Sequence, residues 1–379
     1  MNILVFSWRD PKHPLAGGAE QVVHEHMKGW TEAGHNVTLF SSWIKGLERE
    51  DEIDGIKILR KGYQYLGVQI AAFFYYLKNK NNYDFLVDQF HGIPFFTPMY
   101  TRKPKIAIIQ EAARKVWFLN PLPIPINWIV AVIGYFGEPF VFLLYRNVPF
   151  ITGSNSAKSD LVKLGIPQKN IYVVNHGTII VKPNNLVKKE KQPTIIYLGR
   201  ISKDKGIEEA LEAFKILKQN GITNFWVVGK PETETYGKHI DQLVKKLNLD
   251  SEVKFWYKKG VVSDRQKFEL LKRSYIMINP SALEGWGLVN IEASAIGTPV
   301  VAYRSQGLID SVKDGVSGII CSQNTPQELA KNVLDLLSDK DKLKKLSETS
   351  IKWSQNFTWD KSKKKSLSLI DNVYNSAIK

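Results

Sequence analysis

The chain has 379 residues, which is enough for two domains of ordinary size. Hydrophobic residues make up 44% of it and charged residues 23%, so a disordered or fibrous protein is excluded. Its single cysteine, Cys321, excludes an intrachain disulfide and a cysteine-based metal cluster.

The formal net charge is +15, and three interpretations of it are open. Lysine runs such as Lys363–Lys365 ordinarily form a solvated surface, but a basic protein can also bind anionic membrane or nucleic acid. No recognisable nucleic-acid module is present, so we expect no nucleic-acid partner. The N-terminus has the pattern of a buried strand rather than a signal peptide, which predicts a cytoplasmic protein, at the inner face of the membrane if it binds lipid.

Short apolar runs alternate with helical stretches in the first 180 residues, which is typical of a parallel α/β domain. The pattern predicts a strand at Asn2–Ser7, a helix at Ala19–Ala33 ended by Gly34, and a strand at Val37–Ser41. Further strands are expected at Phe85–Val87, Lys105–Ile109, Phe150–Thr152 and Tyr172–Val174.

Residues 181–192 have the composition of a linker, and the alternation then restarts. Strands are expected at Thr194–Leu198, Phe225–Val228, Val253–Trp256 and Tyr275–Asn279, and helices at Ile207–Gln219 and Tyr236–Leu247. The second half is therefore predicted to be another doubly wound domain. Two such domains place a ligand in a cleft at the carboxyl ends of their strands.

Residues 116–137 contain no charged residue, and three interpretations of this segment are open. It is long enough to span a membrane, but prolines interrupt its first half and Glu138-Pro139 ends its apolar run. A buried helical segment is the ordinary alternative. The third is a hydrophobic patch that rests on a membrane or takes a lipid acceptor, for which aromatic residues such as Trp128 and Phe136 are suited.

The strongest motif follows the strand Tyr275–Asn279 and contains Glu284-Gly285-Trp286-Gly287. A helix over Leu288–Ile296 leaves backbone N–H groups free at Gly287, Leu288 and Val289, and these amides with the helix dipole bind anions. Glu284 and Glu292 flank this helix start. Carboxylates accept hydrogen bonds from sugar hydroxyls, and amides hold phosphate, so the motif suits a nucleotide-sugar. The alternative is a pair of cap or surface carboxylates.

The second motif is the loop that follows the strand Thr194–Leu198 and carries Arg200 and Lys205. Two cations at the carboxyl end of a strand are placed to converge on a diphosphate. They can stabilise the charge of a leaving group, as Mg²⁺ does elsewhere. A surface ion pair with Asp204 is the alternative.

Gly17 and Gly18 stand between the first strand and the first helix, where glycine lets backbone approach a ligand closely. A structural Gly-Gly turn explains them equally well. No G-x-G-x-x-G fingerprint follows this strand, and no G-x-x-x-x-G-K-[ST] motif occurs.

The sequence contains two groups of residues of metal-ligating types, and neither group predicts a metal site. His24, Glu25 and His26 point to different sides of a helix, so a helix-surface location is expected. Asp339 and Asp341 lie among helical lysines rather than after a strand. We therefore expect no metal ion and no cofactor.

Together these motifs resemble the large retaining glycosyltransferase family 4, of GT-B fold. The resemblance covers nearly the whole chain and rests on the Glu284-to-Glu292 spacing, the Arg200 and Lys205 pair, the Gly17-Gly18 turn and Phe357-Thr358-Trp359-Asp360. It implies two Rossmann-like doubly wound domains facing across a cleft. Residues 1–180 would bind the acceptor, 181–192 would link, 193–357 would bind the nucleotide-sugar, and the helix 358–379 would pack back on the first domain.

The resemblance also implies roles for individual residues. Glu284 should face the donor sugar and Glu292 the ribose hydroxyls, while Gly17 and Gly18 approach from the N-terminal domain. The diphosphate contacts would come from Arg200, Lys205 and the amides of Gly287, Leu288 and Val289. The family's mechanism is usually described as front-face, in which the leaving phosphate helps to deprotonate the acceptor.

The sequence departs from the family pattern at two places. Gln110 and Glu111 stand where relatives often have a histidine near the sugar, so that role passes to them or to neither. Residues 255–257 stand where a glycine is common, so base preference does not carry over. His91, after the strand Phe85–Val87, is a further candidate to line the cleft.

The resemblance predicts a metal-independent transfer of sugar from a nucleotide-diphosphate-sugar to a glycan or lipid-linked acceptor. Contact with anionic membrane is an accompanying expectation. Two other functions are open: a GT-B sugar-nucleotide epimerase, and a non-catalytic nucleotide-binding or scaffold protein.

Overall fold

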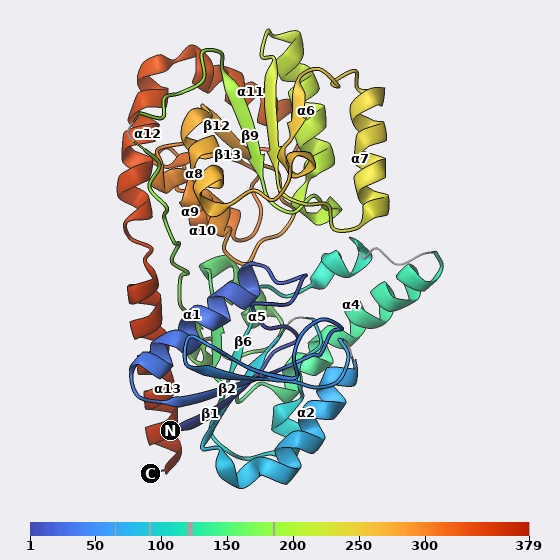
Figure 1. Cartoon of the computed structure of the whole chain (residues 1–379), viewed down its shortest axis with the longest axis vertical. Coiled ribbons are helices and arrows are strands. Elements are labelled where there is room, and N and C mark those ends of the chain that lie inside the picture. Colours follow the sequence, from blue (N-terminus) through green and yellow to red (C-terminus); the bar gives the residue numbers. More distant parts are fainter. Residues whose placement is uncertain (65, 91, 120–123, 185, 379) are drawn as a thin grey trace. The chain divides into compact units, whose positions relative to one another are not determined.

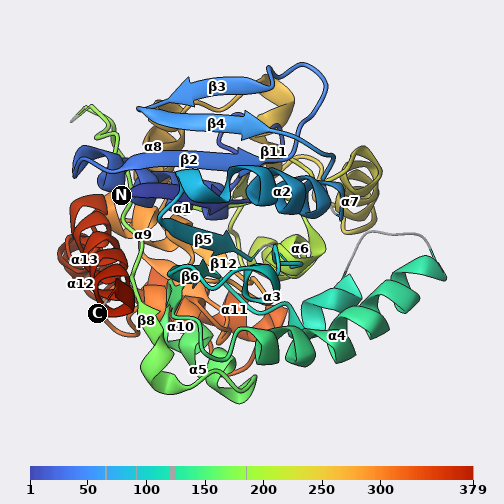
Figure 2. The ribbon, with the colours of Figure 1, turned by 90° about the horizontal axis from the view of Figure 1, so that it is seen from below.

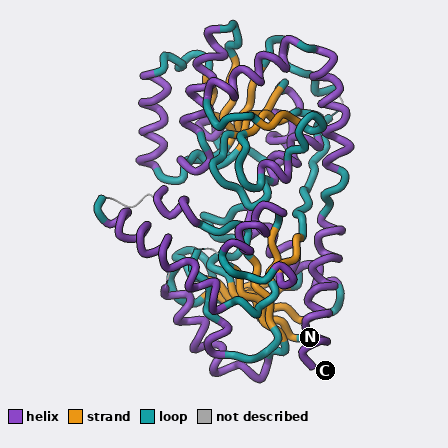
Figure 3. Tube along the Cα trace, turned by 180° about the vertical axis from the view of Figure 1, so that it is seen from behind, coloured by secondary structure: helices purple, strands orange, loops and turns teal. Residues whose placement is uncertain are grey.

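A computed structural model describes residues 1–64, 66–90, 92–119, 124–184 and 186–378. The chain divides into two compact units, Met1–Gly177 with Trp359–Lys379, and Thr178–Thr358 (Figure 1). In each unit the strands lie inside and the helices outside (Figure 3). The expected α/β class, with two doubly wound domains, is confirmed.

Among the residues described, the N-terminal unit forms an eight-stranded sheet in the order β3-β4-β2-β1-β5-β6-β7-β8. Neighbouring strands are parallel except β3 and β4. Their bounds are β1 (Asn2–Phe6), β2 (Asn36–Ser41), β3 (Glu50–Ile53), β4 (Ile56–Arg60), β5 (Phe85–Gln89), β6 (Lys105–Ile108), β7 (Phe150–Thr152) and β8 (Ile171–Val173).

The β3-β4 hairpin at the edge of this sheet was not expected from the sequence (Figure 2). β3 is mostly acidic and partly exposed, so it lacks the apolar run that marks a buried strand. The available signal was Asp54-Gly55, a typical hairpin turn in which both residues have positive φ, 51° and 76°.

Helices cover both faces of the N-terminal sheet. They are α1 (Gly18–Glu32), α2 (Leu66–Asn79), α3 (Thr97–Tyr100), α4 (Ile126–Leu144), α5 (Asn155–Lys163) and α13 (Trp359–Ile378). Side chains alternate along β1, so Ile3 and Val5 pack with α1 and α13, whereas Leu4 and Phe6 pack with α2. The C-terminal helix is thus part of the N-terminal core.

The contacts of α1 with α13 and, at His24, with Asp54 of the β3-β4 turn correct the expectation for His24, Glu25 and His26. All three are buried, so the helix-surface expectation was wrong. His26 Nε2 lies 3.0 Å from Ser362 Oγ, and burial lowers its pKa to about 4. A segment more than 300 residues away in the chain covers this face, which local spacing does not reveal.

In the part of the chain that is described, the C-terminal unit has a six-stranded sheet, all parallel, in the order β11-β10-β9-β12-β13-β14. The strands are β9 (Thr194–Leu198), β10 (Asn224–Val228), β11 (Val253–Phe255), β12 (Ile276–Asn279), β13 (Val300–Ala302) and β14 (Gly318–Ile320). The helices are α6 (Ile207–Gln219), α7 (Glu234–Lys246), α8 (Asp264–Arg273), α9 (Leu288–Ala295), α10 (Leu308–Ser311), α11 (Pro326–Ser338) and α12 (Lys340–Ser354).

The expected linker, residues 181–192, lies within the C-terminal unit and has no helix or strand in its described part. Glu190 holds it there, because Arg273 Nε lies 2.6 Å from Glu190 Oε1. The next strand begins at Thr194, as the sequence predicted.

The apolar segment 116–137 corrects a second expectation. It does not end at Glu138-Pro139, because α4 continues through Pro139 to Leu144. It is also not a buried segment, since α4 buries only Ala131 and Phe142 within the described chain. By length and composition alone α4 could cross a membrane, and it extends away from the strands of its unit (Figures 1 and 3).

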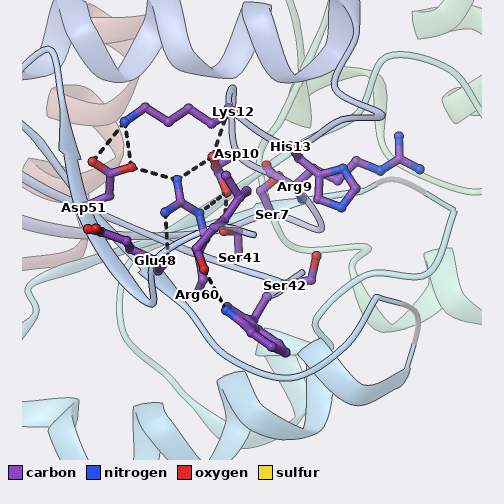
Figure 4. A network of polar contacts seen from close by, with 12 residues as sticks. Ser7, Arg9, Asp10, Lys12, His13, Ser41, Ser42, Glu48, Asp51 and Arg60 are labelled. Atoms are coloured by element: carbon purple, nitrogen blue, oxygen red, sulfur yellow. Dashed lines mark hydrogen bonds and ion pairs between the residues drawn. The ribbon is translucent and has the colours of Figure 1, made fainter. Parts of the chain in front are cut away.

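A buried ion pair fixes the loop between β1 and α1 (Figure 4). Arg60, at the end of β4, donates two hydrogen bonds to Asp10, at 2.7 Å and 2.8 Å, and both side chains are fully buried. Burial raises the pKa of Asp10, but the hydrogen bond and charge of Arg60 outweigh it, so the pKa lies below its ordinary value. Arg60 also contacts Asp51, which pairs with Lys12 at the surface.

Arg60→Met should destabilise the chain by about 3–5 kcal/mol, because it leaves the Asp10 carboxylate buried without its cation. Lys12→Met is the matched control. It removes a half-exposed partner of the same network and should cost about 0–1 kcal/mol. Urea unfolding of both variants measures the difference, and equal losses would show that the Asp10–Arg60 pair does not fix this loop.

Candidate functional site

The site begins with two adjacent strands of the C-terminal unit. β9 and β12 are parallel neighbours, so the loops that follow them leave the same edge of the sheet. Two hydrogen bonds join the loops: Ala282 N–H donates to Asp204 O at 2.9 Å, and Lys205 Nζ donates to Leu283 O at 3.2 Å. The two strongest sequence motifs therefore form one structure.

Lys205 and Glu284 face each other where these loops meet. Lys205 Nζ lies 3.0 Å from Glu284 Oε1, and both side chains are about four-fifths covered. Lys205 also lies 3.6 Å from Asp204 Oδ2. A cation so placed is oriented by two carboxylates while part of it still reaches solvent.

Arg200 joins the group through Asp204. Its guanidinium lies 3.5 Å from Asp204 and 3.5 Å from Glu232, and its side chain is 49% exposed. Burial raises the pKa of Asp204, but Lys205 and Arg200 together hold it below its ordinary value. The alternative expectation, an ion pair with Asp204, is therefore present, and it brings Arg200 and Lys205 to one carboxylate.

The first turn of α9 lies beside this cluster in the sequence and has the predicted geometry. Gly287 is the residue before the helix and has φ +80°, and Leu288 and Val289 begin the helix. The first amide to bond within this turn is that of Asn290, which donates to Gly287 O at 3.0 Å, so helix geometry leaves the amides of Gly287, Leu288 and Val289 without a partner in the turn. The side chain of Asn290 fixes the turn, because it accepts a hydrogen bond from Asn279 at 2.8 Å and donates one to Ser311 at 2.9 Å. A helix start of this kind can bind an anion.

Glu292 has a partner that was not expected from the sequence. Its carboxylate lies 2.7 Å from the Nζ of Lys267, a residue of α8. Burial raises the pKa of Glu292, and the charge and hydrogen bond of Lys267 act against that rise. Lys267 lies 25 residues before Glu292 on an amphipathic helix, and no local motif marks it.

Two glycines allow this packing. A Cβ at Gly206 would lie 2.2 Å from Pro280 O, and a Cβ at Gly307 would lie 2.1 Å from Glu284 O. Both residues also have positive φ, 70° and 73°, which side chains disfavour. Glycine is therefore required on both sides of the Glu284 loop.

The predicted residues of the N-terminal unit follow β1 and β6. Gly17 precedes α1 and donates its N–H to Glu20 at 2.8 Å, and Gly18 is the first residue of the helix. Gln110 follows β6, and its amide oxygen and nitrogen are both buried without a partner in the described chain. Glu111 is half-buried. His91 lies outside the described residues.

Among the described residues, no three His, Cys, Asp or Glu side chains are grouped so that they could hold a metal ion. Asp339 instead caps α12, accepting from Lys342 N at 2.9 Å.

Residues 179–353 match the model of a protein family described as glycosyl transferases group 1. An uncharacterised glycosyltransferase of Methanocaldococcus jannaschii is 30% identical over 166 residues, 44% of each chain. The chain thus matches about half the length of this curated relative.

Two solved structures are similar over the whole chain. Sucrose-phosphate synthase of Thermosynechococcus elongatus has a TM-score of 0.80 at 18% identity and covers 99% of both chains. Anabaena HepE in complex with UDP-glucose has a TM-score of 0.72 at 19% identity, over 98% of this chain and 100% of that one. The fold is therefore of the GT-B type, as expected.

Gly206→Ala should destabilise the chain more than Gly221→Ala, by about 1–3 kcal/mol. Both glycines have positive φ, but a Cβ at Gly221 meets nothing within 4 Å, so the control carries the backbone strain alone. Chemical denaturation of the two variants gives the difference. If Gly206→Ala lowers the free energy of unfolding no more than Gly221→Ala does, Gly206 is not needed for the close approach of the two loops.

Proposed function

We propose that this chain, whose residues 179–353 match the glycosyl transferases group 1, transfers a sugar from a nucleotide-diphosphate-sugar to a glycan or lipid-linked acceptor. The observation that carries the proposal is the Lys205–Glu284 contact at 3.0 Å, joined to Arg200 by Asp204 and followed by the α9 turn. Cations and helix amides suit a diphosphate, and carboxylates suit sugar hydroxyls. HepE, of the same fold, was solved with UDP-glucose, which supports a nucleotide-sugar as donor.

In the proposed reaction the bond between the sugar's anomeric carbon and the diphosphate oxygen breaks, and a bond to the acceptor oxygen forms. Negative charge grows on the leaving diphosphate. Lys205, Arg200 and the amides of Gly287, Leu288 and Val289 stabilise it, which lets the reaction proceed without a metal ion. Fixed cations in a partly covered site need no rearrangement as this charge develops.

We propose a retaining course, in which the acceptor attacks from the side that the diphosphate leaves. A phosphate oxygen of the leaving group takes the acceptor proton, so no protein base is required. Glu284 accepts hydrogen bonds from the donor sugar, and Glu292 from the ribose. An ionised carboxylate accepts such bonds more strongly than a protonated carboxyl does.

The N-terminal unit is proposed to bind the acceptor. Gln110 supports this, because a buried amide with neither atom bonded is costly unless a ligand completes it. Its donor and acceptor atoms match a sugar hydroxyl. Gly17 caps α1 and Gly18 begins it, and neither has a side chain that would restrict backbone contact with a ligand.

Lys205→Ala and Arg200→Ala should each lower turnover by roughly 10²–10³, since each removes a fixed charge that stabilises the leaving group. Activity should survive EDTA. The assay is sugar release or transfer with a panel of nucleotide-sugars. Lys218→Ala is the control: it removes a lysine of the same unit, paired with Glu252 at 2.8 Å, and should leave turnover unchanged.

Near-normal rates in both site variants, or loss of activity in EDTA, would contradict the proposed metal-free mechanism. Donor consumption that yields an epimerised nucleotide-sugar without an added acceptor would indicate the epimerase instead. Nucleotide binding with no turnover of any donor would indicate the scaffold protein.

Lys267→Met should weaken donor binding, and more so as the pH falls. Lys267 lowers the pKa of Glu292 against the effect of burial, so its removal raises that pKa further. Glu292 then becomes protonated at a higher pH, and its hydrogen bonds from the ribose become weaker. The measurement is the donor KM against pH, and Glu292→Gln is the control, whose KM should not vary with this titration. Identical pH profiles in wild type and Lys267→Met would refute the positioning role.

A further inference from the structure

The N-terminal unit carries an exposed apolar face formed by α2 and α4. On α4 five of the exposed apolar side chains recur at three- and four-residue steps, which places them on one side of the helix. These five are Ile129, Ile133, Phe136, Phe140 and Leu143, and α2 adds Ile70, Phe74 and Leu77. The exposed fractions of Phe136 and Phe140 are 65% and 69%.

Both helices lie on the same face of the sheet. Phe6 pairs in register with Asp88, and Asp88 with Ala107, so these side chains point to one side. Phe6 packs with α2, and Ala107 packs in the cluster that contains Phe142 of α4. The exposed sides of α2 and α4 therefore both face away from this side of the sheet, opposite α13 (Figures 1 and 2).

The exposed charges on the segments that carry this face are basic. In the described part of residues 61–150 the exposed charged side chains are Lys61, Lys78, Lys80, Arg102 and Arg146. The acidic residues of the same stretch are all buried or half-buried in the described chain: Asp84, Asp88, Glu111 and Glu138. Glu50, on the neighbouring β3, is an exposed acid that acts on Tyr75 of α2, but the exposed cations outnumber it. An apolar surface whose own segments expose mainly cations is complementary to anionic lipid.

We propose that the face of α2 and α4 binds to the surface of an anionic lipid bilayer. Phe136, Phe140 and their apolar neighbours enter the boundary between headgroups and acyl chains, and the surrounding lysines and arginines contact the headgroups. The inference does not depend on the proposed transfer reaction, because binding to lipid requires no substrate.

The structure favours a helix lying on the bilayer over one that spans it. Glu138, near the middle of α4, accepts hydrogen bonds from Ala113 N at 2.7 Å and Arg114 N at 2.8 Å. Phe142 is buried, and Tyr145, directly after the helix, is buried and donates to the buried Asp88. A spanning helix would have to leave this core.

The test is cosedimentation of the full chain with vesicles of phosphatidylcholine alone and of phosphatidylcholine mixed with phosphatidylglycerol. The wild type should bind the anionic vesicles more tightly. Phe136→Ser with Phe140→Ser should lower the apparent affinity at least about tenfold, because two buried rings are lost. Leu186→Ser with Val261→Ser, which removes two apolar side chains of 81% and 79% exposure in the other unit, should bind as the wild type does.

All four side chains are exposed, so we expect both double variants to fold, and thermal unfolding checks this. Binding that is equal in wild type and Phe136→Ser with Phe140→Ser, or equal to neutral and anionic vesicles, would overturn the proposal, as would no binding. Retention on the vesicles after an alkaline carbonate wash would indicate a spanning helix instead. A wild-type dimer in lipid-free solution that the two substitutions dissociate would assign the face to a second copy of the chain.

Discussion

The close approach of two loops in the C-terminal unit is the constraint on which the candidate site depends. Gly206 lets the loop after β9 pack against Pro280, and Gly307 lets the chain pass close to Glu284 on the other side. Only then do Lys205 and Glu284 come within 3.0 Å. The parallel sheet supplies the shared edge, the glycines remove the steric barrier, and the buried Asn290 network fixes the α9 turn.

The sequence predicts much of this because the signals are local. Ile207–Gln219 is helical as predicted, since its apolar residues recur at helical spacing up to the end of the helix. The strands β9 and β12 are short apolar runs followed directly by glycine or proline, and their ends locate both motifs. Glu284, Arg200 and Lys205 could be grouped because adjacent parallel strands end at the same edge.

What the sequence does not predict depends on distant segments. His26 is buried because α13 covers it, and Glu292 is paired because α8 brings Lys267 to it. The position of α4 is the reverse case. Its apolar composition is typical of a core helix, yet nothing in the described chain covers most of it. Composition shows that a helix prefers an apolar environment, but only packing shows whether the protein itself supplies one.

Diphosphate binding at Lys205 is tested most directly by the affinity of the full chain for nucleoside diphosphates and for the matching nucleosides, in wild type and in Lys205→Ala. Calorimetry with uridine, guanosine and adenosine compounds covers the unknown base. We expect the preferred nucleoside diphosphate to bind the wild type much more tightly than its nucleoside does. In Lys205→Ala most of this difference in affinity should be lost, while the affinity for the nucleoside stays unchanged. An undiminished difference in Lys205→Ala would show that the diphosphate does not bind at this junction.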